Sequence, residues 1–153
     1  MSFTTPSGSR GVSQPHFFTR FLKLFNKYSA GRIRKTGKFG ELPSLVLTTV
    51  GSKSGLERKT PLAYFPAGDG GWLIVASYAG AAKNPDWYYN LAAHPDRVSI
   101  EFGGQTQSVI AQQLHGPARD AAWRHIIAAS QRFADYQEKT DRELPVIRLS
   151  VVT

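Results

Sequence analysis

The chain has 153 residues, enough for one domain with a single core, and 41% of them are hydrophobic, which is ordinary for a globular protein. No apolar stretch approaches the roughly 20 residues of a membrane-spanning helix, and the polar start "MSFTTPSGSRGVSQP" lacks the apolar block of a secretory signal, so we expect a cytoplasmic protein. The net charge of +8 favours an acidic partner, and the absence of cysteine excludes disulfides and thiolate chemistry.

The first 40 residues divide into two parts. Residues 1–15 have the composition of a flexible tail. Residues 16–40 predict a basic amphipathic helix that ends near Gly31, followed by a basic linker. One side of the helix carries aromatic and leucine side chains, and the other carries Arg20, Lys23 and Lys27. Such a helix packs on its own domain or lies on an anionic membrane surface, and an aromatic face at this spacing favours packing.

Residues 41–153 predict the folded domain, which begins with three strands. Residues 44–50 are apolar on both faces, as in a well-buried strand, and residues 57–67 and 72–78 supply the next two. Pro61 places part of the second strand at a sheet edge or bulge. Because short glycine turns join the three strands, an antiparallel sheet is favoured over a βαβ unit.

Two helices and three further strands follow. Asn84 is a good N-cap for a short helix with Pro85 at its first position, and His94-Pro95 ends it. Residues 97–114 predict a hairpin around two glycines, residues 117–139 the longest helix, and residues 144–152 a closing strand. Six strands with peripheral helices predict a mainly β (α+β) fold, a small antiparallel barrel or strongly curled sheet.

The segment "TTVGSKSGLERKTP", residues 48–61, joins two apolar runs and carries three cations. Its simplest interpretation is a solvated hairpin, because Gly51 and Gly55 tolerate positive φ and serines suit turns. The alternative is an anion site, in which backbone N–H groups form a concave cradle and Lys53 and Arg58 supply charge. The spacing of a Walker loop is absent. Local chemistry leaves both interpretations open and slightly favours the hairpin.

A second candidate element is "ASYAGAAKNPDWYYNL", residues 76–91. Its small residues allow a flat ligand to approach the backbone, and the helix start favours negative charge. Trp87 and Tyr88 either wall an aromatic ring or belong to the core, and the core is the commoner role. This element strengthens the case for an anion site at residues 48–61 and leaves the hairpin interpretation open.

Metal and nucleophile chemistry find little support. The four histidines are scattered and none pairs at ligand spacing, and "GSKSG" has lysine where a G-x-S-x-G nucleophile motif has serine. No RNA-binding motif accompanies the basic residues, which argues against nucleic acid as a partner. Chemistry that ordinary side chains cannot perform would therefore have to come from a bound cofactor.

Three stretches together resemble the deazaflavin-dependent nitroreductase family. They are "LTTVGSKSGLERKTPLAYF", "VASYAGAAKNPDWYYNLAAHPDRVSI" and "DYQEKTDRELPVI". They match, in order and spacing, T-T-x-G-x-K-S-G-x-x-R-x-x-P-L, then A-S-x-x-G before a K-x-P-x-W-Y-x-N-L helix, then Y-Q-x-x-T-D-R-x-I-P-V-I. The resemblance implies a six-stranded split β-barrel related to FMN-binding barrels. It also implies coenzyme F420, a deazaflavin hydride carrier whose tail bears a phosphate and a polyglutamate chain.

The resemblance also implies which residues hold each end of F420. The predicted tail contacts are Thr49, Gly51, Ser52, Lys53, Ser54, Gly55 and Arg58. The predicted contacts of the deazaflavin ring are Ala76, Ser77, Gly80 and Trp87, and Tyr78 is a further predicted cofactor contact, at a position that holds the tail in the family. Two positions depart from the family pattern, since Ser52 stands where arginine is frequent and Tyr78 where lysine is frequent.

The same resemblance implies that Tyr136 lies beside the substrate, and we predict it as a candidate proton donor. Ser130 and Phe133 complete the predicted substrate contacts, and they stand where the nitroimidazole-reducing members carry tyrosines. This departure counts against nitro reduction. We therefore expect a hydride acceptor such as a quinone or an activated alkene.

Two rival hypotheses use the same residues. A carrier would bind F420 without catalysis, and a related barrel would bind FMN or haem instead. The N-terminal helix adds the hypothesis of a peripheral membrane contact on the inner face of the cell membrane, where lipid quinones reside. The sequence identifies neither the physiological substrate nor the oligomeric state.

Overall fold

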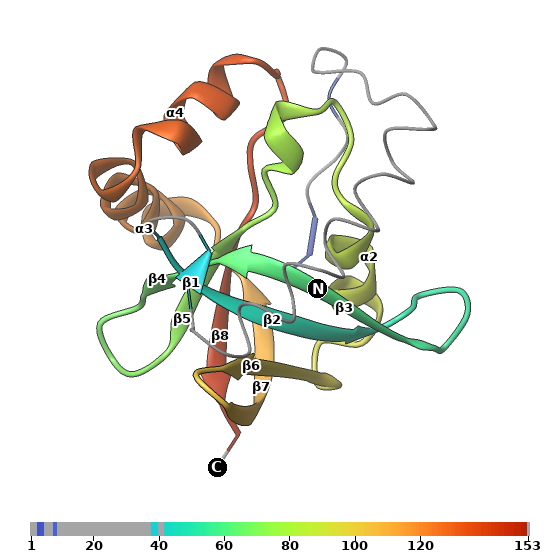
Figure 1. The fold of residues 1–153 in the computed structure, drawn as a ribbon. Helices are drawn as coiled ribbons and strands as arrows, with labels where there is room; N and C mark the ends of the chain where they lie inside the picture. Colours follow the sequence, from blue (N-terminus) through green and yellow to red (C-terminus); the bar gives the residue numbers. More distant parts are fainter. Residues whose placement is uncertain (1–2, 5–7, 9–37, 40–41, 153) are drawn as a thin grey trace.

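The computed structural model describes residues 3–4, 8, 38–39 and 42–152 (Figure 1). The strands are β1 (Lys38–Phe39), β2 (Leu42–Val50), β3 (Glu57–Ala63), β4 (Phe65–Pro66), β5 (Trp72–Val75), β6 (Val98–Phe102), β7 (Gln105–Gln113) and β8 (Val146–Val151). The helices are the 3-10 turn η1 (Tyr78–Gly80), α2 (Asp86–Ala93), α3 (Gly116–Ala129) and α4 (Gln131–Glu138). Figure 1 shows α3 and α4 together on one side of the sheet and α2 on the other.

The strands form one sheet that curls back on itself. Its order is β1-β2-β6-β7-β8-β5-β4, with β3 paired to β2, and every pairing is antiparallel. Only Tyr64 separates β3 from β4, so one segment contacts β2 and β5, which lie far apart in the strand order. The predicted mainly β split-barrel fold is confirmed, and all six predicted strands are present.

The second predicted strand, residues 57–67, is divided into β3 and β4. Pro61 lies in β3, opposite Val46 of β2, and β3 pairs with no other strand among the described residues. This is the edge position predicted for Pro61, because proline cannot donate to a ladder on the second side. The strand predicted over residues 72–78 ends at Val75, because the chain turns into η1 and Tyr78 adopts a φ of 45°.

Two hydrophobic clusters stabilise the fold. The first fills the barrel and the inner face of α2, and it includes Leu45, Leu47, Ile74, Leu91, Ile100 and Leu149. The second lies between the sheet and helices α3 and α4, and it includes Phe65, Val75, Ile126, Phe133 and Leu144. Since apolar burial is the main favourable term in folding, these clusters fix where each helix packs.

The short helix begins one residue later than its cap predicts. Pro85 is the N-cap of α2, with φ −70° and ψ 160°, and no side chain caps the helix. Asn84 is therefore not the cap. Its Oδ1 instead accepts a hydrogen bond of 2.7 Å from Nη1 of Arg142, so it faces a different partner. The helix ends at His94, as predicted.

The long helix predicted over residues 117–139 is wrong as a single element, because it breaks at Ser130. This residue is extended, with φ −151° and ψ 109°, and it both ends α3 and begins α4. The break lets Phe133 enter the second cluster, where its ring centroid lies 5.5 Å from that of Phe65 and 8% of its surface is exposed. Core packing has outweighed helix continuity.

Little of the N-terminal region falls within the described residues, and the predicted helix up to Gly31 lies outside them. Three residues of the predicted tail are described. Phe3 packs its ring edge-on against Tyr88, the amide of Thr4 donates to Oε1 of Gln113, and Gly8 donates to the carbonyl of Ala82. Among the described residues, no helix has the length and hydropathy needed to span a bilayer.

Candidate functional site

The turn between β2 and β3, residues 51–56, is here called the glycine turn; it projects from the sheet on the side where α2 packs (Figure 1). The amide of Gly51 donates to the carbonyl of Leu56 at 2.8 Å, and that of Gly55 donates to the carbonyl of Gly51 at 3.0 Å. Gly55 has a φ of 71°, which glycine adopts at no steric cost. The amide of Leu56 is bound by Oγ of Ser54. The turn is therefore closed by its own hydrogen bonds.

Cationic and amide donors remain available on this turn. Lys53 and Arg58 are exposed, and neither forms an ion pair with a described residue, whereas Lys59 pairs with Glu101 at 3.3 Å. The backbone amides of Lys53 and Ser54 find no acceptor within the described part of the chain. Such a donor set fits a phosphate or carboxylate group, since charge-assisted hydrogen bonds are the strong ones.

One hydrogen-bonded group connects the glycine turn to α2. The amide of Ser52 donates to Oδ1 of Asn90 at 2.9 Å, and Nδ2 of Asn90 donates to Oγ1 of Thr49 at 3.1 Å. Thr49, predicted as a tail contact, is 1% exposed and thus lies beneath the turn. The sequence analysis gave Asn90 no role, although it forms part of the W-Y-x-N-L helix pattern.

Residues 76–84, here called the ring loop, contain the predicted ring contacts. Ala76 is fully buried, Ser77 and Tyr78 are half-buried, and the amide of Gly80 donates to the carbonyl of Ser77. Gly80 has a φ of 81°, and a Cβ there would lie 2.8 Å from the carbonyl oxygen of Tyr136. The loop therefore packs directly against the last turn of α4, and this contact brings Tyr136 beside it.

Arg142 is the main structural support of the ring loop, and the sequence analysis missed it. Its side chain donates five hydrogen bonds to the loop and is 2% exposed. The acceptors are the carbonyls of Ala76 and Ser77 at 2.9 Å each, the carbonyl of Ala81 at 3.2 and 3.0 Å, and Oδ1 of Asn84 at 2.7 Å. All five guanidinium N–H groups are thus used.

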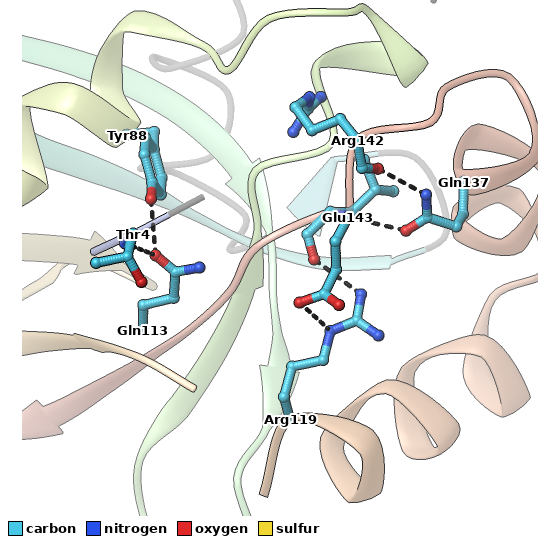
Figure 2. Close-up of polar contacts among 8 residues, drawn as sticks. Thr4, Tyr88, Gln113, Arg119, Gln137, Arg142 and Glu143 are labelled. Atoms are coloured by element: carbon cyan, nitrogen blue, oxygen red, sulfur yellow. Dashed lines mark hydrogen bonds and ion pairs between the residues drawn. The ribbon is translucent and has the colours of Figure 1, made fainter. Parts of the chain in front are cut away.

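The charge of Arg142 is buried without an ion pair to any described residue. Burial lowers the pKa of its guanidinium, and the electrostatic effects of Tyr89 and Tyr88 act in the opposite direction. Figure 2 shows how the backbone of Arg142 is held: Gln137 of α4 donates to its carbonyl at 2.7 Å and accepts from the amide of Leu144 at 3.0 Å. In that view the guanidinium points away from Gln137.

The aromatic residues beside the ring loop are largely core. Trp87 is 7% exposed and belongs to the first cluster, so only an edge of its surface is accessible to a ligand. Tyr88 is also buried, and its hydroxyl donates to Oε1 of Gln113 at 2.7 Å (Figure 2).

The three predicted substrate contacts do not share one environment. Tyr136 is half-buried, and its ring centroid lies 5.8 Å from that of Phe133 and 5.7 Å from Nζ of Lys139. Phe133 is buried in the second cluster, and Ser130 stands at the break between α3 and α4. Of the three, Tyr136 is the one beside the ring loop.

Known proteins share both the sequence and the fold. The F420H(2)-dependent quinone reductase family model matches residues 20–150. An F420H(2)-dependent quinone reductase of Mycobacterium tuberculosis is 40% identical over 140 residues, which cover 88% of this chain and 93% of the relative. A solved F420-H2 dependent reductase, FDR-A, is 37% identical with a TM-score of 0.64, over 71% of this chain and 94% of that one. A FAD-binding protein of Mesorhizobium loti, 14% identical with a TM-score of 0.52 over 98% and 94% of the two chains, shows the fold alone.

The matches at 37% and 40% identity also bear on the cofactor and the class of enzyme. They confirm reduced F420 as the hydride donor and a reductase as the activity. Since the family model matches most of the chain and a relative is 40% identical across 88% of it, the chain belongs to the F420H(2)-dependent quinone reductase family.

Proposed function

We propose that this protein reduces a quinone with a hydride from F420, holding the cofactor's acidic tail at the glycine turn and its ring at the ring loop. The observation that supports this proposal most directly is that Lys53 and Arg58 are exposed and form no ion pair with a described residue. They flank backbone amides that also lack an acceptor there. The name of the Mycobacterium tuberculosis relative supports a quinone as the acceptor.

The glycine turn binds the tail in this proposal. Lys53 contributes a mobile point charge, Arg58 a planar fork that matches two oxygens of a phosphate or carboxylate, and the amides of Lys53 and Ser54 two further donors. Ser52 lies between Asn90 and these donors, and Gly51 and Gly55 let the turn remain compact. Thr49 supports the turn from below through Asn90.

The ring loop orients the reacting end. Bound F420 supplies the hydride. The buried bonds from Arg142 hold the loop in one conformation, and such preorganisation lowers the entropic cost of aligning donor and acceptor. Ser77 and Tyr78, both half-buried, offer the cofactor side-chain surface on this loop. Ala76 and Gly80 are buried and shape the loop, and Trp87, 7% exposed, lies on the adjoining helix.

Tyr136 supplies a proton to the acceptor. A quinone becomes a hydroquinone on gaining one hydride and one proton, so the reaction needs a donor in addition to the hydride carrier. The phenol of Tyr136 has no hydrogen-bond partner among the described residues, and the backbone carbonyl of the same residue lies against Gly80 of the ring loop. Phe133 acts less directly in this scheme, because it is buried and its ring packs against that of Tyr136. Ser130 also acts less directly, at the break where α4 begins.

Titration of the protein into F420, followed by the fluorescence of the deazaflavin, tests the proposal at its first step. We expect saturable binding of F420 and no comparable binding of FMN. Reduced F420 with a soluble quinone should then give turnover, and Tyr136→Phe should lower kcat by about 100-fold or more with F420 affinity unchanged, on the scale of general acid catalysis.

Each contrary outcome has a distinct meaning. Preference for FMN or haem would overturn the assignment of the glycine turn to an acidic tail. Tight binding of F420 without turnover across a panel of quinones and activated alkenes would indicate a carrier, the rival hypothesis. Equal kcat for Tyr136→Phe and the unaltered protein would remove the phenol as proton donor.

We further propose that the N-terminal amphipathic helix brings a cytoplasmic enzyme to the anionic membrane surface, where lipid quinones reside. The support is the sequence pattern, with an aromatic face opposite Arg20, Lys23 and Lys27. Sedimentation with anionic liposomes should pellet the full chain and leave a chain lacking residues 1–34 in solution. Equal pelleting of both forms would contradict the proposal, and neutral liposomes are the control for charge.

A further inference from the structure

Among the described residues, one hydrogen bond joins the glycine turn to another element. Its internal bonds join Gly51 to Leu56 and Gly55 to Gly51, and they close the loop without fixing its direction from the sheet. The amide of Ser52 donates instead to Oδ1 of Asn90 on α2, at 2.9 Å. Because Ser52 directly precedes Lys53, this bond fixes the backbone immediately before the free amides of the turn.

The amide group of Asn90 can adopt only one useful orientation. Its Nδ2 donates to Oγ1 of Thr49 at 3.1 Å, while its Oδ1 accepts from Ser52. Reversing the amide would place an N–H group against the Ser52 amide, so the bond to Ser52 would be lost, whereas the Thr49 hydroxyl can donate as well as accept. Asn90 is 7% exposed and Thr49 is 1% exposed, so water competes little for either bond.

The helix that carries Asn90 is itself anchored in the core. Leu91 is fully buried, and Trp87 packs in the first cluster on the same face of α2. This rigid support gives Asn90 a fixed position relative to the barrel. The position of the glycine turn is therefore fixed relative to α2, the helix that follows the ring loop.

From this arrangement we propose that Asn90 is a positioning residue for the glycine turn. By holding the turn, Asn90 sets the affinity for the phosphorylated, acidic tail of the ligand and leaves the affinity for its ring unchanged. The inference rests on the proposed function, since it concerns the same turn. Asn90 acts through Ser52, by holding the amides of Lys53 and Ser54 and the side chain of Lys53 in one arrangement. Without it the turn must be ordered by the ligand, and that ordering costs binding free energy.

The test compares two ligands that share the ring. One is F420, and the other is the deazaflavin chromophore with its ribityl chain but without the phosphate and glutamates. Asn90→Ala should weaken F420 binding about tenfold, equivalent to about 1.4 kcal/mol, and change the affinity for the tail-less compound by less than about twofold. Asn90→Ser keeps a polar group at the site and should show the same selectivity if the alanine variant folds poorly.

A matched control is Asn84→Ala. Asn84 is similarly buried, but its Oδ1 accepts from Arg142 of the ring-loop network, so this variant should leave the ratio of the two affinities at the value of the unaltered protein. A changed ratio in the Asn90 variants alone supports the inference. If the Asn90 variants leave the ratio of the two affinities unchanged while the unaltered protein binds F420, the role of Asn90 is overturned and the proposed function still stands. Failure of the unaltered protein to bind F420 overturns both.

Discussion

Replacing Arg142 with methionine is expected to lower the free energy of unfolding by about 3 to 5 kcal/mol. Methionine has a similar length but no donor, so four oxygens of the ring loop lose the hydrogen bonds that Arg142 donates, while the carbonyl of Ser77 keeps its bond from the Gly80 amide. Each unsatisfied buried acceptor costs on the order of 1 to 3 kcal/mol, and some of this cost is recovered by relaxation or by water.

The loss should be visible in urea denaturation as a lower midpoint with an unchanged slope. Arg148→Met is the matched control, because Arg148 lies half-exposed on β8 and pairs with the exposed carboxylate of Asp69. Exposed ion pairs contribute about 0 to 1 kcal/mol, so the control should lose no more than that. Equal losses in the two variants would contradict the support role of Arg142.

Truncating Lys53 of the glycine turn together with Arg58 of β3, neither of which forms an ion pair with a described residue, should have the largest effect on cofactor affinity. Lys53→Ala combined with Arg58→Ala is expected to cost about 1 to 3 kcal/mol for each residue, the range of charge-assisted hydrogen bonds, so F420 affinity should fall by roughly 30-fold or more. The effect should shrink as salt is added, because screening already weakens exposed charges. Fluorescence titration at two ionic strengths measures both quantities.

A control with the same loss of charge separates local contacts from the overall field of a basic protein. Arg124 and Arg132 are exposed on α3 and α4, away from the glycine turn (Figure 1). Their double alanine variant has the same net charge and should retain F420 affinity within about threefold, the limit set by long-range screening. Unchanged F420 affinity in the Lys53 and Arg58 double variant would contradict the assignment of the F420 tail to these two residues.

The strand content of this fold is readable from sequence because its signals are local. Gly103 and Gly104 both adopt positive φ, at the hairpin turn where two consecutive glycines predict it. The errors arise where a distant partner decides the local structure. The helix is interrupted at Ser130, and Phe133 packs against Phe65. Asn84 does not cap α2 but accepts a hydrogen bond from Arg142.

The candidate site shows the same division. Lys53 and Arg58 stand out in the sequence because charge and glycine concentrate in one short segment. Arg142 does not, because its acceptors lie 58 to 66 residues earlier in the chain. Asn90 bonds to residues 38 and 41 positions away. Periodicity and turn chemistry carry no information about such pairs, so only the T-D-R and W-Y-x-N-L patterns of the resemblance include these residues.

The position of β8 has a kinetic consequence. This strand lies between β5 and β7, so Trp72 pairs with Leu149 and Val75 with Val146 across most of the domain's sequence. Until those residues arrive, the two-residue β4 is the one other strand that pairs with β5 within the described part of the chain. Pairings this remote slow folding into the range of milliseconds to seconds, and an unpaired apolar strand is prone to aggregation during that interval. The pairing of β8 with β5 and β7 therefore ends the interval in which β5 is exposed to aggregation.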